Sequence, residues 1–142
     1  MKKHFVRILS ILLAFSFTFC VAHASTRASQ YIYKYDALSV ASDETITVYF
    51  EISGTSVMSK IGASTIVIER YNGNDWDPVR TFSSGSTTGM TGSSVKSYSG
   101  SVAYDATVSG SYRAVVTVFT TLNGGTDSRT VTTNTVTVVC NP

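Results

Sequence analysis

The chain has 142 residues and a formal net charge of +2, with 43% hydrophobic and 14% charged residues. Beyond residue 24 the basic side chains occur singly along the chain. This argues against nucleic acid or an anionic membrane surface as a partner, because both are bound by clustered basic faces.

The first 24 residues have the features of a secretory signal peptide. Three basic residues precede an apolar run from Ile8 to Val21, and Ala22-His23-Ala24 forms an A-x-A cleavage site. The run of about 14 residues is shorter than the roughly 20 needed to span a bilayer. We therefore expect a signal helix that is cleaved between Ala24 and Ser25, which leaves a secreted chain of residues 25–142 with no stable membrane insertion.

Cleavage also removes chemical groups. The mature chain keeps eight basic and nine acidic side chains, no histidine, and one cysteine. The absence of histidine excludes a Ser-His-Asp triad, a Cys-His pair and a zinc site of the Cys/His type. We expect no enzymatic activity, no metal and no cofactor. A hydrolase built on two facing carboxylates is the catalytic alternative that the composition leaves open.

Alternating apolar and polar residues predict β-strands, and no stretch of the mature chain has helical periodicity. The strands are expected, in chain order, at residues 31–40, 45–52, 63–71, 76–82, 95–105, 110–121 and 129–139. Residues 53–62 and 83–94 are predicted to be loops, and Asn72-Gly73 is a hairpin signal. About seven strands without a helix indicate a single domain with an immunoglobulin-like antiparallel β-sandwich fold over residues 25–142.

The strand at residues 110–121 is apolar on both faces, which is typical of a central strand. Tyr112 follows a turn, where immunoglobulin-like sandwiches place a tyrosine whose hydroxyl bonds back to the backbone of the corner. An ordinary strand tyrosine is the alternative. Ala114 stands two residues on, where antibody domains often have a cysteine, so packing must replace that disulfide.

Two groups of aromatic residues are candidate ligand-binding residues. Trp76, the only tryptophan, adjoins Tyr71 across the predicted hairpin. The two rings could form a platform for sugar stacking, although a core position for Trp76 is the commoner role. Tyr31, Tyr33 and Tyr35 share one side of the first predicted strand, either as an exposed interaction stripe or as cross-strand packing.

Two further features allow two interpretations each. The Asn and Asp side chains between Asn72 and Asp77 could supply oxygen ligands to Ca²⁺, but their spacing is not that of a calcium loop and favours a turn. Cys140 could form an intermolecular disulfide or remain a lone thiol near the C-terminus.

The chain resembles a family of small secreted proteins of Gram-positive gut bacteria that is catalogued as a domain of unknown function. The resemblance covers about residues 29–137, in GTSVM, then Ile61-Gly62-Ala63 leading into TIVIERYNGNDWDPVRTF, then SYSGSVAY, GSYRAVVTVF and GGTDSRT. It implies a secreted single domain with no assigned activity or cofactor, and it carries over no functional residues.

These patterns together predict a secreted, non-enzymatic domain that binds or adheres to an extracellular protein or glycan. The alternative is a structural or self-associating secreted protein, joined through Cys140 or through an exposed edge strand.

Overall fold

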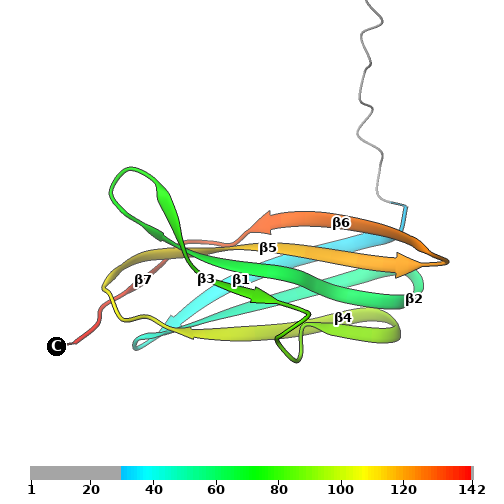
Figure 1. The fold of residues 1–142 in the computed structure, drawn as a ribbon, viewed down its shortest axis with the longest axis horizontal. Coiled ribbons are helices and arrows are strands. Elements are labelled where there is room, and N and C mark those ends of the chain that lie inside the picture. Colours follow the sequence, from blue (N-terminus) through cyan, green and yellow to red (C-terminus); the bar gives the residue numbers. More distant parts are fainter. Residues whose placement is uncertain (1–29, 142) are drawn as a thin grey trace, which may run out of the picture.

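The computed structural model describes residues 30–141, so the predicted signal peptide and its cleavage site lie outside the described residues. Within that range the protein is all-β, with no helix, and its seven antiparallel strands form one sheet that curls into a half-barrel (Figure 1). The strands are β1 (Ile32–Ser42), β2 (Thr45–Tyr71), β3 (Trp76–Ser83), β4 (Thr91–Asp105), β5 (Gly110–Leu122), β6 (Gly125–Thr132) and β7 (Val136–Val138). The predicted all-β class is confirmed.

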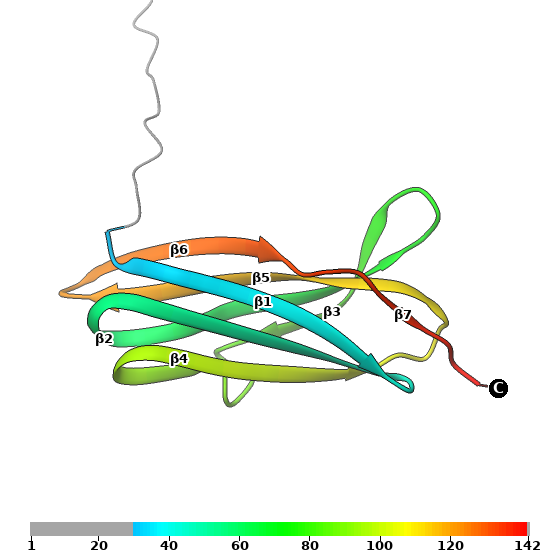
Figure 2. The ribbon, with the colours of Figure 1, turned by 180° about the vertical axis from the view of Figure 1, so that it is seen from behind.

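The longest strand, β2, organises the sheet. Its first part, residues 45–53, lies between β1 and β4, and its later part pairs with β5 and β3. Between these parts the strand turns back on itself, so the sheet has two facing layers (Figures 1 and 2). The loop predicted at residues 53–62 is therefore wrong, because this segment continues β2 around the corner.

Glycines and buried side chains shape this corner. The pairing of β2 with β4 shifts register between Ser53 and Met58, which gives β2 extra residues there. Gly62 has a φ of 152°, and a Cβ at this position would overlap the carbonyl oxygen of Met90. A glycine is therefore required for β4 to approach β2 closely. Met58 and Ile61 are fully buried and fill the inside of the corner.

Alternate residues of the strands fill the space between the two layers. In β2 and β5 the inward-facing residues are almost fully buried, and they are Ile46, Val48, Phe50, Ile52, Ile66, Ile68, Tyr112, Ala114, Val116 and Val118. The intervening residues face solvent or are half-buried, as the period of two requires. β5 pairs with β2 on one edge and with β6 and β7 on the other, so its predicted central position is confirmed.

The hydrogen bond predicted for Tyr112 is confirmed. The Tyr112 hydroxyl donates to the carbonyl oxygen of Val108 at 2.6 Å, across the turn that precedes β5. Ala114 is fully buried, so the position of a possible disulfide is filled by close packing.

Side chains close the seam between β1 and the last strands. Asp127 Oδ2 accepts the backbone N–H groups of Gln30 and Tyr31, both at 2.7 Å. At the other end, Asn134 Oδ1 accepts the N–H of Ser39 at 2.9 Å, and Asn134 Nδ2 donates to the Ser39 carbonyl at 3.0 Å. A carboxylate and a carboxamide thus take the place of strand-to-strand backbone bonds.

The last predicted strand, residues 129–139, is divided in the structure into β6 and β7. At the break, the Thr133 N–H donates to the Ala114 carbonyl, and Thr133 Oγ1 accepts the Ala114 N–H, both at 2.9 Å. The same hydroxyl lies 2.7 Å from the Ser39 hydroxyl. Period-two patterning does not reveal the break, because a polar Thr-Asn-Thr segment also suits an exposed strand face.

We expect Tyr112→Phe to lower the free energy of unfolding by about 1 kcal/mol, because it removes one hydrogen bond from a packed corner. Burial raises the pKa of the Tyr112 hydroxyl, with the neighbouring Tyr104 adding to this effect. The raised pKa contributes stability that is complete below the ordinary value of 10.0 and is lost as pH rises through the folded-state value.

Urea unfolding at neutral and alkaline pH measures both effects, and Tyr104→Phe at neutral pH is the matched control for the hydrogen bond. Tyr104 packs against Tyr112 at a centroid distance of 6.3 Å, and within residues 30–141 its hydroxyl has no hydrogen-bond partner. Equal losses in the two variants would contradict a specific role for the corner hydrogen bond.

A second stability prediction compares two buried threonines. Among the residues that the structure describes, Thr120 Oγ1 is buried without a hydrogen-bond partner, whereas Thr133 Oγ1 is hydrogen-bonded. Thr120→Val should raise the free energy of unfolding by about 1 kcal/mol, because it removes a hydroxyl that burial penalises. Thr133→Val should lower it by about 2 kcal/mol, because the Ala114 N–H loses its acceptor. Changes of the same sign in both variants would contradict this assignment.

Candidate functional site

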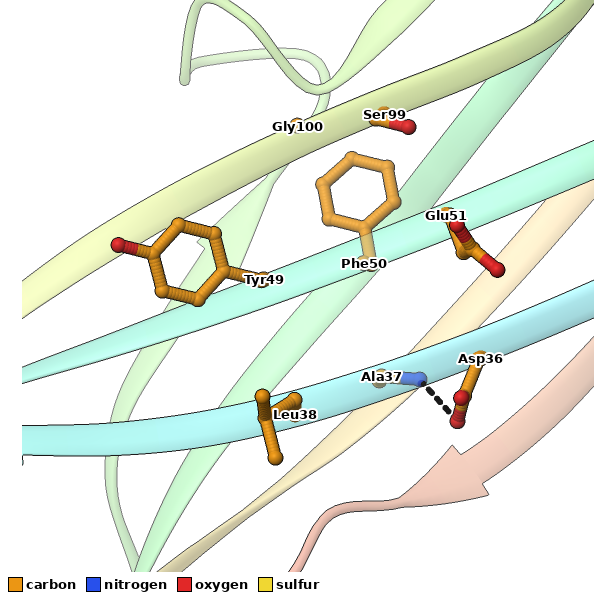
Figure 3. A pocket seen from close by; sticks show the side chains of 8 residues that line it. All are labelled: Asp36, Ala37, Leu38, Tyr49, Phe50, Glu51, Ser99 and Gly100. Atoms are coloured by element: carbon orange, nitrogen blue, oxygen red, sulfur yellow. Dashed lines mark hydrogen bonds between the residues drawn. The ribbon is translucent and has the colours of Figure 1, made fainter.

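A shallow groove lies on the outer face of the layer formed by β1, the first part of β2, and β4. It has a volume of about 340 Å³ and is lined by Asp36, Ala37, Leu38, Tyr49, Phe50, Glu51, Ser99 and Gly100. Figure 3 shows Tyr49 and Leu38 on one side of the groove and the two carboxylates on the other. The groove thus has an apolar half and an acidic half.

The apolar half consists of large side chains that face solvent. Tyr49 is 50% exposed, and Leu38, its direct cross-strand partner, is 51% exposed. Val40 follows Leu38 on the same face of β1 and is 43% exposed. A contiguous group of exposed apolar side chains on one sheet face is a recognised mark of a binding surface.

The acidic half contains Asp36 and Glu51, which are opposite each other in the pairing of β1 with β2. Lys34 Nζ lies 2.7 Å from Glu51 Oε1, and both side chains are more than half exposed. The bond to Glu51 raises the pKa of Lys34. An open carboxylate beside a lysine suits a hydrogen-bond acceptor for ligand hydroxyls better than a catalytic acid, which is usually kept protonated by apolar surroundings.

Small residues form the floor of the groove. Gly100 lies opposite Phe50 in the pairing of β4 with β2. A Cβ at Gly100 would lie 2.5 Å from the Gly89 carbonyl oxygen and 2.7 Å from Phe50 Cζ. Any larger residue at position 100 would therefore displace the core ring or the loop before β4, and would disturb the groove from below.

Trp76 and Tyr71 lie together across the β2–β3 hairpin, as the sequence suggested, and outside the groove. Their ring centroids are 5.3 Å apart at the start of β3, where Trp76 is half-buried and Tyr71 is exposed. Arg113 of β5 reaches across, with its guanidinium carbon 4.3 Å from the centroid of the Trp76 ring. Trp76 therefore lies on the outside of the sheet and is not a core residue.

The three N-terminal tyrosines do not form a one-sided stripe. A register shift between Ile32 and Lys34 places Tyr33 in a bulge, where it is 78% exposed. Tyr31 is half-buried and packs against the core, and Tyr35 is 37% exposed. The hairpin that carries Trp76 lies at the opposite end of the molecule, so the two aromatic groups are separate surfaces (Figure 1).

Residues 72–77 form a turn stabilised by its own side chains. Asn72 Oδ1 accepts the N–H groups of Asn74 and Asp75, at 2.9 and 2.8 Å. Asn72 Nδ2 donates to Asp77 Oδ2 at 2.9 Å. These bonds engage the oxygen atoms that a calcium ion would need and support the turn interpretation. Across residues 30–141, no group of three or more His, Cys, Asp and Glu side chains is placed to hold a metal ion.

Cys140 is held in place beyond β7. Its N–H donates to Ser109 Oγ at 2.8 Å, and its thiol donates to the Ala106 carbonyl at 3.3 Å. The side chain is half-buried and packs against the core. A disulfide to a second chain would first have to release this thiol from its contacts.

The sequence reasoning missed the groove as a site, although it contained a usable signal. The strict alternation over residues 45–52 directs Tyr49 and Glu51 outwards. An aromatic ring and a carboxylate that face solvent from the same side of one strand are a combination that indicates a ligand-binding surface. The partners from β1 and β4 could not be assigned, because strand order is set by long-range pairing.

Comparisons with known proteins do not assign a family to this chain. No protein-family model matches the chain, and no curated protein matches it. One solved structure that the chain partly matches is the crystal structure of a family 76 glycoside hydrolase from a bovine Bacteroides thetaiotaomicron strain, at 12% identity and a TM-score of 0.35. The match covers 72% of this chain and only 20% of that chain.

Residues 30–141 contain no helix that is long and apolar enough to cross a membrane.

We expect a thiol reagent to modify Cys140 much more slowly in the native chain of residues 25–142 than in the same chain unfolded in urea, because the native thiol is packed and hydrogen-bonded. Ser109→Ala should speed the native reaction, since it removes the acceptor for the Cys140 N–H. Rapid formation of a disulfide-linked dimer on a non-reducing gel, abolished by Cys140→Ser, would contradict this prediction.

Proposed function

We propose that this protein is a secreted, non-enzymatic binding domain that holds a neutral saccharide in the groove beside Tyr49. The observation that carries the proposal is an exposed aromatic ring in one groove with two carboxylates and a serine residue. Sites for small ligands commonly combine an apolar surface with a few polar groups in this way.

The chemistry of a sugar matches the two halves of the groove. The C–H face of a pyranose packs on an aromatic ring, so Tyr49 and Leu38 would contact that face. Sugar hydroxyls donate hydrogen bonds, and Asp36 and Glu51 would accept them as charge-assisted bonds. The groove is open and shallow, which favours a segment of a polysaccharide over a small molecule that requires enclosure.

The strand order supports an immunoglobulin-like sandwich for this domain. One layer contains β1, the first part of β2, and β4; the other contains β3, the later part of β2, β5, β6 and β7. Two facing layers and a corner tyrosine at the start of β5 are features that this domain shares with that fold, and they support the proposal. Secretion through a cleaved signal peptide, inferred from residues 1–24, would bring the groove to extracellular glycans.

We expect the mature chain to bind members of a panel of immobilised neutral oligosaccharides. Tyr49→Ala should weaken that binding by about tenfold or more, as truncation of a central aromatic contact does. Asp36→Asn should weaken it less, because the amide oxygen still accepts a hydrogen bond.

Tyr33→Ala is the matched control, since Tyr33 is a more exposed tyrosine on the neighbouring strand β1 but outside the groove. Equal losses in the Tyr33 and Tyr49 variants would contradict the proposal, and so would the absence of binding to any oligosaccharide of the panel. Binding to a protein ligand that depended on Tyr49 would instead assign the groove to a protein partner.

Self-association is the second candidate function, and it rests on open sheet edges. In the described part of the chain, β3 and β4 each pair only with β2 and so have one unpaired edge. Pro78 on β3 and Lys96 on β4 are residue types that hinder edge-to-edge pairing. Light scattering at high concentration distinguishes the two functions, because a monomer is expected of a binding domain.

A further inference from the structure

A second group of side chains lies on the opposite outer face of the half-barrel. Arg113 on β5 and Glu69 on β2 are opposite each other in the strand register, and Arg113 Nε donates to Glu69 Oε2 at 2.7 Å. The guanidinium carbon of Arg113 also lies 4.3 Å from the centroid of the Trp76 ring on β3. The Arg113 cluster, which comprises Arg113, Glu69, Trp76 and Tyr71, thus spans three neighbouring strands.

The arginine of this cluster is fixed in place but not saturated with hydrogen bonds. Among residues 30–141, its bond to Glu69 is the only hydrogen bond or ion pair that Arg113 makes. Both terminal nitrogens therefore keep their N–H donors for another acceptor. The Arg113 side chain is 30% exposed and that of Glu69 is 17% exposed, so the cluster is partly shielded from water. Charged hydrogen bonds are stronger in such surroundings than on an open surface.

A guanidinium held through Nε presents its two terminal nitrogens side by side. This fork matches the two oxygens of a carboxylate, which it binds through two parallel hydrogen bonds. Glu69 occupies only Nε, and the guanidinium carbon lies over the Trp76 ring, which limits the movement of the side chain. Glu69 and Trp76 therefore act as positioning residues for the fork.

An apolar surface adjoins the fork. The Tyr71 ring packs against Trp76 at a centroid distance of 5.3 Å and is exposed to solvent. The Tyr71 hydroxyl donates to the Gly73 carbonyl at 3.0 Å, which holds the ring against the hairpin. An aromatic ring of this kind can pack against the C–H face of a sugar whose charged group reaches the arginine.

We propose that the Arg113 cluster binds a saccharide that carries a carboxylate, such as a hexuronic acid residue. The carboxylate lies on the terminal nitrogens of Arg113, and the sugar ring lies against Tyr71. This site differs from the Tyr49 groove in charge and lies on the other outer face, so the two proposals can fail separately.

The chain contains a single tryptophan, which makes the site directly observable. We expect methyl β-D-glucuronide to change the Trp76 fluorescence saturably, and methyl β-D-glucoside, its neutral counterpart, to bind at least about tenfold more weakly, as loss of a charged hydrogen-bonded pair requires. Glucose 6-phosphate tests whether any anion suffices. Equal binding of the phosphate would overturn the assignment to a carboxylate, and no saturable response to the glucuronide would overturn the site.

Variants of Arg113 distinguish binding through the planar guanidinium from simple attraction to a positive charge. Arg113→Lys keeps the positive charge but has no planar fork, so it should weaken glucuronide binding by about tenfold or more. Arg80→Lys is the matched control, because Arg80 also stacks on a ring, that of Phe82, with its guanidinium carbon 5.3 Å from the ring centroid. Its glucuronide affinity should be unchanged, as should that of Tyr49→Ala.

Titration calorimetry gives a second readout that does not depend on fluorescence. It also allows Trp76→Phe to be measured, which should weaken glucuronide binding while leaving neutral oligosaccharide binding at Tyr49 intact. Equal losses in the Arg80 and Arg113 variants, or full affinity in Arg113→Lys, would overturn the proposal. If Arg113→Lys does not fold, Trp76→Phe gives the deciding measurement, and full affinity in that variant has the same meaning.

Discussion

The fold depends on the corner at which β2 passes from one layer to the other. Four of the other six strands pair with β2, so its course fixes where they lie. The corner requires Gly62 at a positive φ and at a spacing from Met90 that no side chain permits. Met58 and Ile61 fill its inner side. The corner also sets how the two parts of β2 pair with β4, because the register of that pairing shifts between Ser53 and Met58.

Much of this arrangement follows from local sequence patterns. Alternation over residues 45–52 correctly assigns the inward residues and directs Tyr49 outwards, and the turn before Tyr112 correctly predicts a hydrogen bond to the backbone. Local patterns do not distinguish a bent strand from a loop, because the extra residues between Ser53 and Met58 interrupt the period of two. The same limit hid the bulge at Tyr33, which ended the expected tyrosine stripe.

The candidate sites were less predictable than the fold, because each is assembled across strands. The groove joins Leu38 to Tyr49, and the Arg113 cluster joins β5 to the hairpin of Trp76. Tyr71 and Trp76 could be paired from the hairpin sequence alone, since a short turn fixes their register. The position of Arg113 beside Trp76 could not be predicted in this way. The two residues are far apart in the sequence, and only the pairing of β2 with β5 brings them together.

The seam of β1 has a mechanical consequence. Residues 30 and 141 lie at opposite ends of the long axis of the molecule, and the strands run nearly along it (Figures 1 and 2). Tension between these ends would slide β1 past β2 and would load their backbone hydrogen bonds together, not one after another. The hydrogen bonds from the Asp127 and Asn134 side chains to the backbone of residues 30, 31 and 39 resist the same displacement. The β1 strand is therefore held against extension along the long axis by backbone and side-chain hydrogen bonds that act in parallel.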